Sequence, residues 1–305
     1  MRTLDSHAFF AAFALALVAI ALLGLRPALA QTPHGRSAAS APLPANALQA
    51  SAAAANSAQA NASPTSAAPA NGIPPSSRQT GAMPTVVVVK VAKPWYAPDA
   101  LIVRKMRQAM PQYAAIPGLS FKIFTLARPG REFGGVYLWQ DRAAADAWFG
   151  PAWHERVRRE RGVEADVRMF DAPLAFSTPA ADAARPETLE TAVVTLVTVP
   201  VPPNADRAAL REGFVAAAAI ERKAPGLLRQ YALVNDTRMG GAYLWRDEAS
   251  ARAWFDARWQ ATMRKRYGVA PQVEWLDAPI LLPSTAPANL AAERALFRQA
   301  EGAGR

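Results

Sequence analysis

The stretch 134–139, Gly-Gly-Val-Tyr-Leu-Trp, returns 106 residues later at 240–245 as Gly-Gly-Ala-Tyr-Leu-Trp. At this one offset, 19 of the 43 positions from Gly134 to Phe176 are identical, and the alignment needs no gap. A long fixed period is the mark of a structural unit that occurs more than once in a chain. The sequence therefore predicts the same domain twice, over residues 85–178 and 191–284.

Each copy has the apolar pattern of a β-α-β-β-α-β unit. In the first copy we expect strands near 86–91, 119–126, 134–139 and 166–171, with helices at 100–110 and 142–161. In the second copy we expect strands near 193–199, 227–234, 240–245 and 272–277, with helices at 208–223 and 248–267. Gly150-Pro151 predicts a break in the second helix of the first copy, whereas its counterpart from Glu248 to Tyr267 is expected to be unbroken. Gly134-Gly135 indicates a bulge or the entry to a hairpin, because no helix follows it as a phosphate loop requires.

The strands carry the main clue to the architecture. Val86–Val89 and Val136–Trp139 show no alternation of apolar and polar residues, so both faces of these strands should be buried. A ferredoxin-like β-α-β-β-α-β unit covers only one face of its sheet with helices. We therefore expect an α+β protein in which two four-stranded sheets, one from each repeat, face each other with the helices outside.

The flanking segments differ from the two repeats in composition. Residues 1–30 read as a secretory signal peptide, with an apolar run ending in Ala28-Leu29-Ala30, and an uncleaved membrane anchor is the rival interpretation. Residues 31–84 are rich in Ala, Ser and Pro and are expected to be disordered. Residues 179–190 form a linker and 285–305 a tail. After signal cleavage no stable membrane span is expected, and the protein should be periplasmic or secreted.

Composition excludes several kinds of chemistry. The chain has no cysteine, so it has no disulfide, thiolate metal site or cysteine nucleophile. His and carboxylates do not cluster with metal-ligand spacing, and we predict no metal site and no cofactor. The net charge is +10, with its densest cluster at Arg156–Arg161. That cluster is interpreted as the solvated end of a helix, and export argues against a nucleic-acid partner.

Three motifs together resemble a known family. They are Pro117-Gly-Leu-x-x-Lys122, the Gly-Gly-x-Tyr-Leu-Trp stretch, and an aromatic-rich helix that ends in Arg158-x-x-x-Gly162-Val163. Both repeats resemble the YdhR-like mono-oxygenases of the dimeric α+β barrel superfamily. The resemblance implies a barrel made from two domains, here an intrachain dimeric α+β barrel in a monomer with an internal pseudo-dimer. In the second repeat, Arg229-Gln230 replaces Phe121-Lys122, a departure that questions equal activity of the two halves.

The resemblance implies a cofactor-independent mono-oxygenase that acts on a small aromatic or quinol-like molecule. The candidates for catalysis are His154, Tyr137 and Tyr243. His154 could serve as a general base or an axial haem ligand, but position 260 of the second repeat is Gln, and an exposed helical His is the alternative. A non-catalytic periplasmic module that binds a small ligand and a haem-binding protein remain the alternative functions.

The large aromatic side chains are the second set of candidates. They can line a pocket for a small apolar or aromatic ligand, or they can simply fill the core. The candidate pocket residues are Phe121, Tyr137, Trp139, Trp148, Trp153, Tyr231, Tyr243, Trp245, Trp254 and Trp259.

Overall fold

The computed structural model describes residues 83–183 and 189–285, together with 289, 293–294 and 297–298. The expected signal peptide and nearly all of the expected disordered segment lie outside the described residues. Of the expected linker, Pro179–Ala183 forms the short helix α7. Of the tail, Thr285 lies outside any helix, and the other described residues, 289, 293–294 and 297–298, are helical.

Both halves show the predicted order of strands and helices. The first half contains β1 (Thr85–Ala92), α4 (Asp99–Ala114), β2 (Leu119–Ala127), β3 (Glu132–Trp139), α5 (Arg142–Trp148), α6 (Pro151–Arg161), β4 (Asp166–Asp171) and β5 (Ala175–Ser177). The second half contains β6 (Val193–Pro200), α8 (Arg207–Glu221), β7 (Leu227–Val234), β8 (Arg238–Trp245), α9 (Glu248–Trp254), α10 (Ala257–Tyr267) and β9 (Gln272–Pro283). The architecture is thus α+β and ferredoxin-like.

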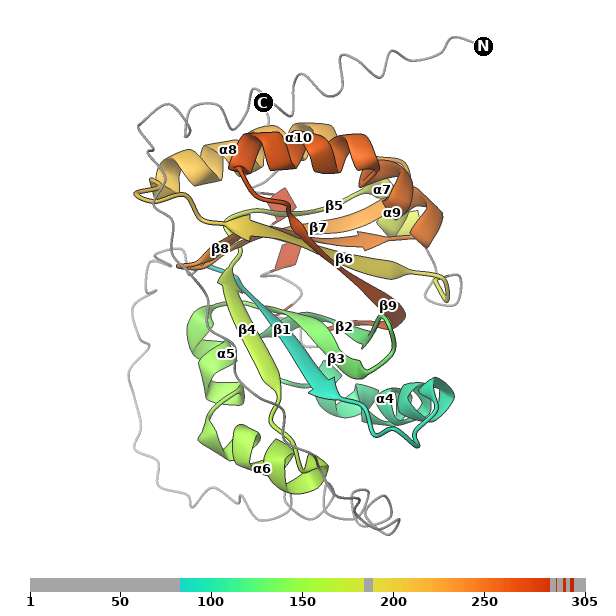
Figure 1. Ribbon diagram of the computed structural model, residues 1–305. Helices are drawn as coiled ribbons and strands as arrows, with labels where there is room; N and C mark the ends of the chain where they lie inside the picture. Colours follow the sequence, from blue (N-terminus) through green and yellow to red (C-terminus); the bar gives the residue numbers. More distant parts are fainter. Residues whose placement is uncertain (1–82, 184–188, 286–288, 290–292, 295–296, 299–305) are drawn as a thin grey trace, which may run out of the picture.

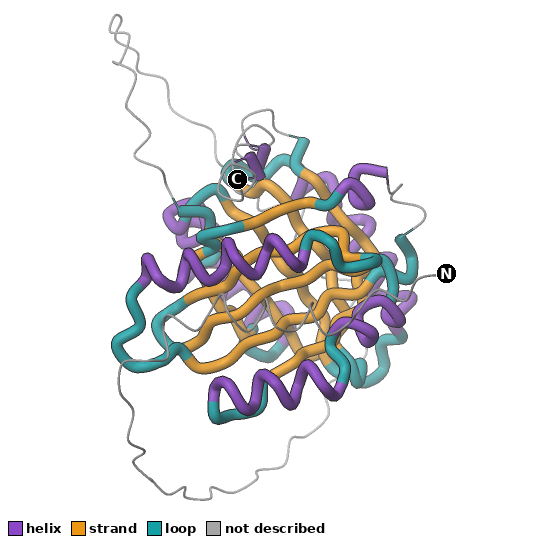
Figure 2. The backbone as a smooth tube through the Cα atoms, turned by 90° about the horizontal axis from the view of Figure 1, so that it is seen from above, coloured by secondary structure: helices purple, strands orange, loops and turns teal. Residues whose placement is uncertain are grey.

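The strands of both halves belong to one sheet, in the order β4-β1-β3-β2-β9-β6-β8-β7-β5. An additional pairing of β4 with β7, at Asp171 and Val234, closes eight of the strands into a ring. The helices lie outside this ring (Figures 1 and 2). The strand pattern predicted two four-stranded sheets that face each other. The structure differs because the sheets are also joined edge to edge, between β2 and β9.

This edge contact depends on a last strand that is longer than the sequence indicated. We expected it to end at Asp277, but β9 continues to Pro283. Residues 272–277 of β9 pair with β6 of their own half. Leu276 and Asp277 also pair with β2 of the other half, and that pairing continues from Ile280 to Pro283. The pairing with β2 shifts register between Asp277 and Ile280, across Ala278-Pro279, where proline offers no N–H to a ladder. In the first half β4 and β5 occupy the equivalent positions, and β5 crosses over to pair with β7.

The burial of both strand faces is confirmed. Val86 and Val88 belong to a cluster that also contains Val194 and Leu196, so this core lies between the two halves. Val87 and Val89 point the other way and pack with the aromatic residues beneath the helices of the first half. Figure 2 shows the helices lying around the outside of the strands. A strand between two apolar layers has no need of polar alternation.

The expectation of one unbroken helix from Glu248 to Tyr267 is wrong. The chain forms two helices, α9 and α10, with a break at Phe255-Asp256. The Asp256 carboxylate accepts a hydrogen bond from the backbone N–H of Trp259 at 2.7 Å, and so caps the start of α10. The first half breaks at the same place, where Gly150 precedes Pro151. An aspartate cap and a proline at the first helical position give the same break by different means.

The interpretation of Gly134-Gly135 as a bulge or hairpin entry is also wrong. Both glycines lie in β3, where Gly134 is paired with Lys90 on one side and Thr125 on the other. A Cβ atom on Gly134 would lie 1.9 Å from the carbonyl oxygen of Val89. The glycine is therefore needed because the neighbouring backbone approaches so closely.

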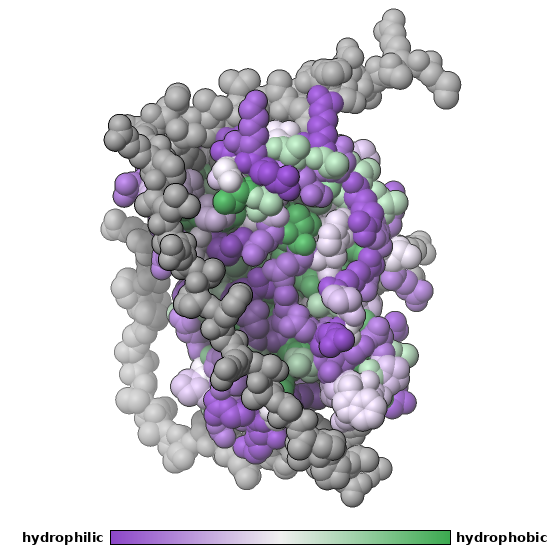
Figure 3. Space-filling model, in the orientation of Figure 1, coloured by the Kyte–Doolittle hydropathy of each residue, from purple (hydrophilic) through white to green (hydrophobic). Residues whose placement is uncertain are grey.

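The coloured surface in Figure 3 is mostly hydrophilic, with hydrophobic residues visible in patches between the hydrophilic ones. Large exposed hydrophobic side chains include Trp95, which is 90% exposed in the loop between β1 and α4. Within the part of the chain that the structure describes, no helix is long and apolar enough to span a membrane.

We predict that Gly134→Ala lowers the free energy of unfolding by about 3 kcal/mol, because the new methyl group forces β1 and β3 apart. Denaturant unfolding of the purified protein measures this. Gly150→Ser is the matched control, since a Cβ there meets its nearest atom at 3.6 Å and serine caps a helix well. Equal stability of Gly134→Ala and the native protein would contradict the close approach.

Candidate functional site

Each half contains a cavity between the outer face of the sheet and its helices. The first-half cavity measures about 410 Å³ and the second-half cavity about 60 Å³. The first is lined mainly by Val89, Val91, Leu101, Ile102, Lys105, Met106, Tyr113, Lys122, Phe124, Phe133, Tyr137, Trp153, Arg156, Val157, Glu160 and Arg161. Only the first has the size typical of a small-molecule site, which is roughly 300–1,000 Å³.

Lys122 is the unusual residue of the first-half cavity. It lies in β2, every residue of which is buried, and only 2% of Lys122 is exposed. Strand alternation sends Phe121 and Ile123 into the core between the halves and Lys122 towards the helices. The Lys122 Nζ lies 3.0 Å from the centre of the Tyr113 ring, 3.8 Å from that of Phe124 and 4.4 Å from that of Tyr137.

Among the described residues, the Lys122 amine has no hydrogen-bond partner and no carboxylate counter-ion; its contacts are the three aromatic faces. A buried cation–π contact stabilises the charged form by about 2 kcal/mol. Removing an ammonium from water costs several kcal/mol. The second effect is larger, and burial lowers the pKa of Lys122 well below its ordinary value of 10.5. The site therefore favours a neutral amine, which can accept a proton or attack an electrophile.

Two tyrosines place hydroxyl groups in the same cavity. Tyr113 comes from α4 and Tyr137 from β3, and their side chains share a hydrogen bond. Burial raises the pKa of both hydroxyls. They are therefore protonated near neutral pH and can donate to an oxygen atom of a ligand.

The entrance of the cavity carries charge. Lys105, Arg156 and Arg161 line it and are exposed, and Glu160 lies among them. Arg161 also stacks over the Phe133 ring, at 5.6 Å from its centre. Three cations against one carboxylate give this entrance a net positive charge, which attracts anionic groups.

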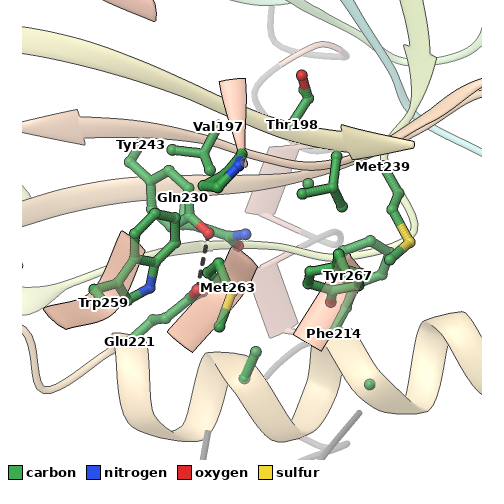
Figure 4. Close-up of a pocket in the computed structure, with 15 residues that line it drawn as sticks. Val197, Thr198, Phe214, Glu221, Gln230, Met239, Tyr243, Trp259, Met263 and Tyr267 are labelled. Carbon is green, nitrogen blue, oxygen red and sulfur yellow. Dashed lines mark hydrogen bonds between the residues drawn. The ribbon is translucent and has the colours of Figure 1, made fainter. Parts of the chain in front are cut away.

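The second-half cavity has a different polar group. Glu221 at the end of α8 is 2% exposed, and its Oε1 accepts a hydrogen bond from the Tyr243 hydroxyl at 2.9 Å (Figure 4). Its Oε2 is buried and has no partner among the described residues. Burial raises the pKa of Glu221 to about 7, against a smaller lowering by Tyr243. This carboxyl is thus close to half-protonated at neutral pH.

The two cavities lie at equivalent positions of the two halves. Tyr113 and Lys122 of the first correspond, 108 residues later, to Glu221 and Gln230 of the second. Larger side chains narrow the second cavity. Phe214, Met263 and Tyr267 stand where the first half has Met106, Val157 and Arg161.

The sequence-predicted pocket residues fall into three groups. Tyr137 and Trp153 line the first cavity, and Tyr243 and Trp259 line the second. The others line neither of these two cavities. Trp139, Trp148, Trp245 and Trp254 pack between helices and sheet, whereas Phe121 and Tyr231 lie in the core between the halves.

His154 also lines neither cavity. It is half-buried on α6, and its ring packs edge-on against Trp153 with centres 5.0 Å apart. Among the described residues no group of three His, Asp or Glu side chains is placed to hold a metal ion. Because Tyr137 lines the first cavity and His154 does not, the structure does not bring these two candidate residues together in one cavity.

Sequence reasoning did not assign a role to Tyr113, Lys122 or Glu221. Lys122 entered only as part of a family motif. A stronger signal was available, because a lysine within the apolar run 119–127 has to be buried if that run is a central strand. Glu221 at the end of the apolar run 214–220 is a similar exception.

Comparisons with known proteins agree with this architecture. Residues 89–179 match the family described as "Putative mono-oxygenase ydhR", which confirms the resemblance over the first half. No curated protein matches the chain. The family match ends before the second half begins, so the matched residues include Lys122 but not Gln230.

Solved structures with the same fold include a putative monooxygenase from Fusobacterium nucleatum, with 12% identity and a TM-score of 0.51. It covers 66% of this chain and 95% of its own. The chain is also similar to a putative monooxygenase from Lactobacillus acidophilus, with 12% identity, a TM-score of 0.46, and coverage of 66% of this chain and 96% of that one.

We predict that Glu221→Gln removes a pH dependence of stability. Below about pH 4.5 the Glu221 carboxyl is neutral in the folded and unfolded states. Between pH 4.5 and about pH 7 this carboxyl ionises in the unfolded chain but stays mostly neutral in the folded protein. The free energy of unfolding therefore falls by up to about 3 kcal/mol as pH rises through this range. Urea unfolding at pH 5 and pH 8 should show this loss in the native protein and not in Glu221→Gln.

The matched control is Glu212→Gln, an exposed residue on the same helix. Its pH profile should follow that of the native protein. Parallel profiles for Glu221→Gln and the native protein would contradict the raised pKa of Glu221.

Proposed function

We propose that the protein is a cofactor-independent mono-oxygenase that oxidises a small aromatic or quinol-like molecule in the first-half cavity. The observation that carries the proposal is the buried amine of Lys122 among aromatic rings in a cavity of about 410 Å³. The family match over residues 89–179 supports the reaction class. Independence from a cofactor follows from the family resemblance.

The chemistry begins with removal of a proton from the substrate. A neutral Lys122 amine accepts the proton of a phenolic hydroxyl, and the substrate becomes an electron-rich anion that can react with O₂. Two hydrogens leave the substrate in total. One oxygen atom enters the product, and the other leaves as water.

The cavity contributes position and polarity to this reaction. Aromatic walls hold a flat substrate, and the hydroxyls of Tyr113 and Tyr137 donate hydrogen bonds to the oxygen on which negative charge develops. An apolar surrounding also keeps water away from reactive intermediates.

The second half has a scaffolding role in this proposal. Its cavity of about 60 Å³ is too small for an aromatic ring, and Gln230 replaces the lysine. We infer that the chain is a tandem duplication in which the second half replaces the second subunit of a dimer. The Fusobacterium structure supports this, because it matches about two thirds of the chain, more than either half alone.

The remaining parts of the proposal come from the sequence. The chain would be exported through residues 1–30 and act in the periplasm or outside the cell. It would work as a monomer, because β2 and β9 of one chain already supply the contact between the halves.

We predict that the native protein consumes O₂ with at least one member of a hydroquinone and anthrone panel. Lys122→Gln should lower kcat about 100-fold, because a general base contributes that much to a proton transfer. Tyr137→Phe should lower it less. An oxygen electrode, with product identification by mass spectrometry, measures both.

Tyr243→Phe is the control, since it makes the same change at the equivalent position of the second half. It should keep the rate of the native protein. No O₂ uptake with any member of the panel, or an equal loss in Tyr243→Phe, would refute the assignment to the first half.

A further inference from the structure

We propose that Lys122 is also a nucleophile, which binds a carbonyl compound covalently as an imine in the first-half cavity. The ligand class is an aldehyde or reactive ketone with an apolar body and an anionic group. This activity goes beyond the proposed oxygenation, because it needs neither O₂ nor an oxidisable ring.

The first requirement is an amine that is neutral, reachable and without a counter-ion. A lysine that is desolvated in an apolar pocket meets it, because burial disfavours the ammonium form. Lys122 lies in such a pocket, faces three aromatic rings, and has no carboxylate partner among the described residues. The lowered pKa of Lys122 agrees with this geometry.

The remaining lysines of the chain do not share this environment. Lys90 is paired with Glu274 and Lys93 with Asp99, so each of these amines has a carboxylate partner. Lys105, Lys223 and Lys265 are exposed. The chain has no other lysine, and Lys122 is therefore the one lysine that is buried without a carboxylate partner among the described residues.

The second requirement is a route for protons. The Lys122 nitrogen attacks the carbonyl carbon, the carbonyl oxygen takes up a proton, and a carbinolamine forms. The carbinolamine then loses its hydroxyl group as water, and the nitrogen gives up its proton to leave the imine. The reaction consumes one amine and one carbonyl and yields one imine and one water, with no change in oxidation state.

The hydroxyls of Tyr113 and Tyr137 are placed to assist these steps. Both tyrosines line the cavity. Their rings, like that of Phe124, contact the Lys122 amine. Their shared hydrogen bond lets one hydroxyl donate to the leaving oxygen while the other restores the proton. The apolar walls limit the water that would hydrolyse the imine.

The entrance sets the charge of the ligand. Lys105, Arg156 and Arg161 are the exposed cations among the residues that line the cavity, and Glu160 is the one lining residue of opposite charge. A carboxylate on the ligand would meet these cations while its carbonyl group reaches Lys122. This arrangement selects an oxo acid over a neutral aldehyde.

The test uses 4-carboxybenzaldehyde and sodium cyanoborohydride with the full chain at pH 6.5. The reductant converts an imine into a stable secondary amine, which peptide mass spectrometry locates. Ordinary lysines are almost entirely protonated at this pH, because their pKa is about 10.4. We expect labelling of Lys122 to be at least tenfold faster than that of Lys223, and to saturate with aldehyde concentration.

Lys122→Gln, which places the second-half residue in the first half, should lose this label and keep its melting temperature. Lys223→Gln, an exposed position in the second half, should keep it. Labelling that is spread over the surface lysines, or absent from Lys122, would overturn the proposal. Equal labelling by benzaldehyde, which lacks the carboxylate, would overturn the preference for anionic ligands.

This experiment is independent of the oxygenase proposal. A protein that labels at Lys122 but consumes no O₂ keeps the covalent site and loses the oxygenase. A protein that consumes O₂ without labelling at Lys122 does the reverse.

Discussion

The structure depends on one constraint, which is that the central strands have apolar residues on both faces. A single ferredoxin-like sheet with helices on one side would leave its other face in water. The two halves remove that exposure by placing Val86 and Val88 of one against Val194 and Leu196 of the other. The long strand β9 then leaves its own half and pairs with β2, which adds backbone hydrogen bonds to the apolar contact. Because the inner faces cover each other, the outer faces are the ones that can hold cavities, each beneath its own helices.

The sequence predicted this layer arrangement because the prediction rested on which strand faces must be buried. Uninterrupted valines at 86–89 have only one explanation in a strand, namely burial on both sides. The prediction failed where two different residue patterns give the same structure. Gly150-Pro151 and Asp256 both break a helix, but only the first break was predicted. It also failed at Gly134, because the approach of a neighbouring backbone carbonyl belongs to the pairing of strands and leaves no periodic signal.

The candidate site was less predictable than the fold. The faithfully repeated aromatic residues drew attention, yet most of them are repeated because both halves pack helices on a sheet in the same way. The residues that give the cavity its chemistry are those that differ between the halves, such as Tyr113 against Glu221 and Lys122 against Gln230. Residues that are identical in the two halves therefore identify the scaffold. Buried positions at which the polar residues differ identify the candidate site.

The difference between the halves is also a difference in volume, and the two are physically linked. An unpaired lysine needs space and a polarisable wall, and the first half provides both through the Tyr113 and Phe124 rings and a cavity of about 410 Å³. The second half has Gln230 in place of the lysine, and its Glu221 carboxyl accepts a hydrogen bond from Tyr243. Phe214 and Tyr267 fill part of the space that is open in the first half. A filled cavity favours stability, whereas an open one sacrifices packing. The half that keeps the open cavity also keeps the buried amine, which is the combination expected where a ligand, and not a side chain, completes the packing.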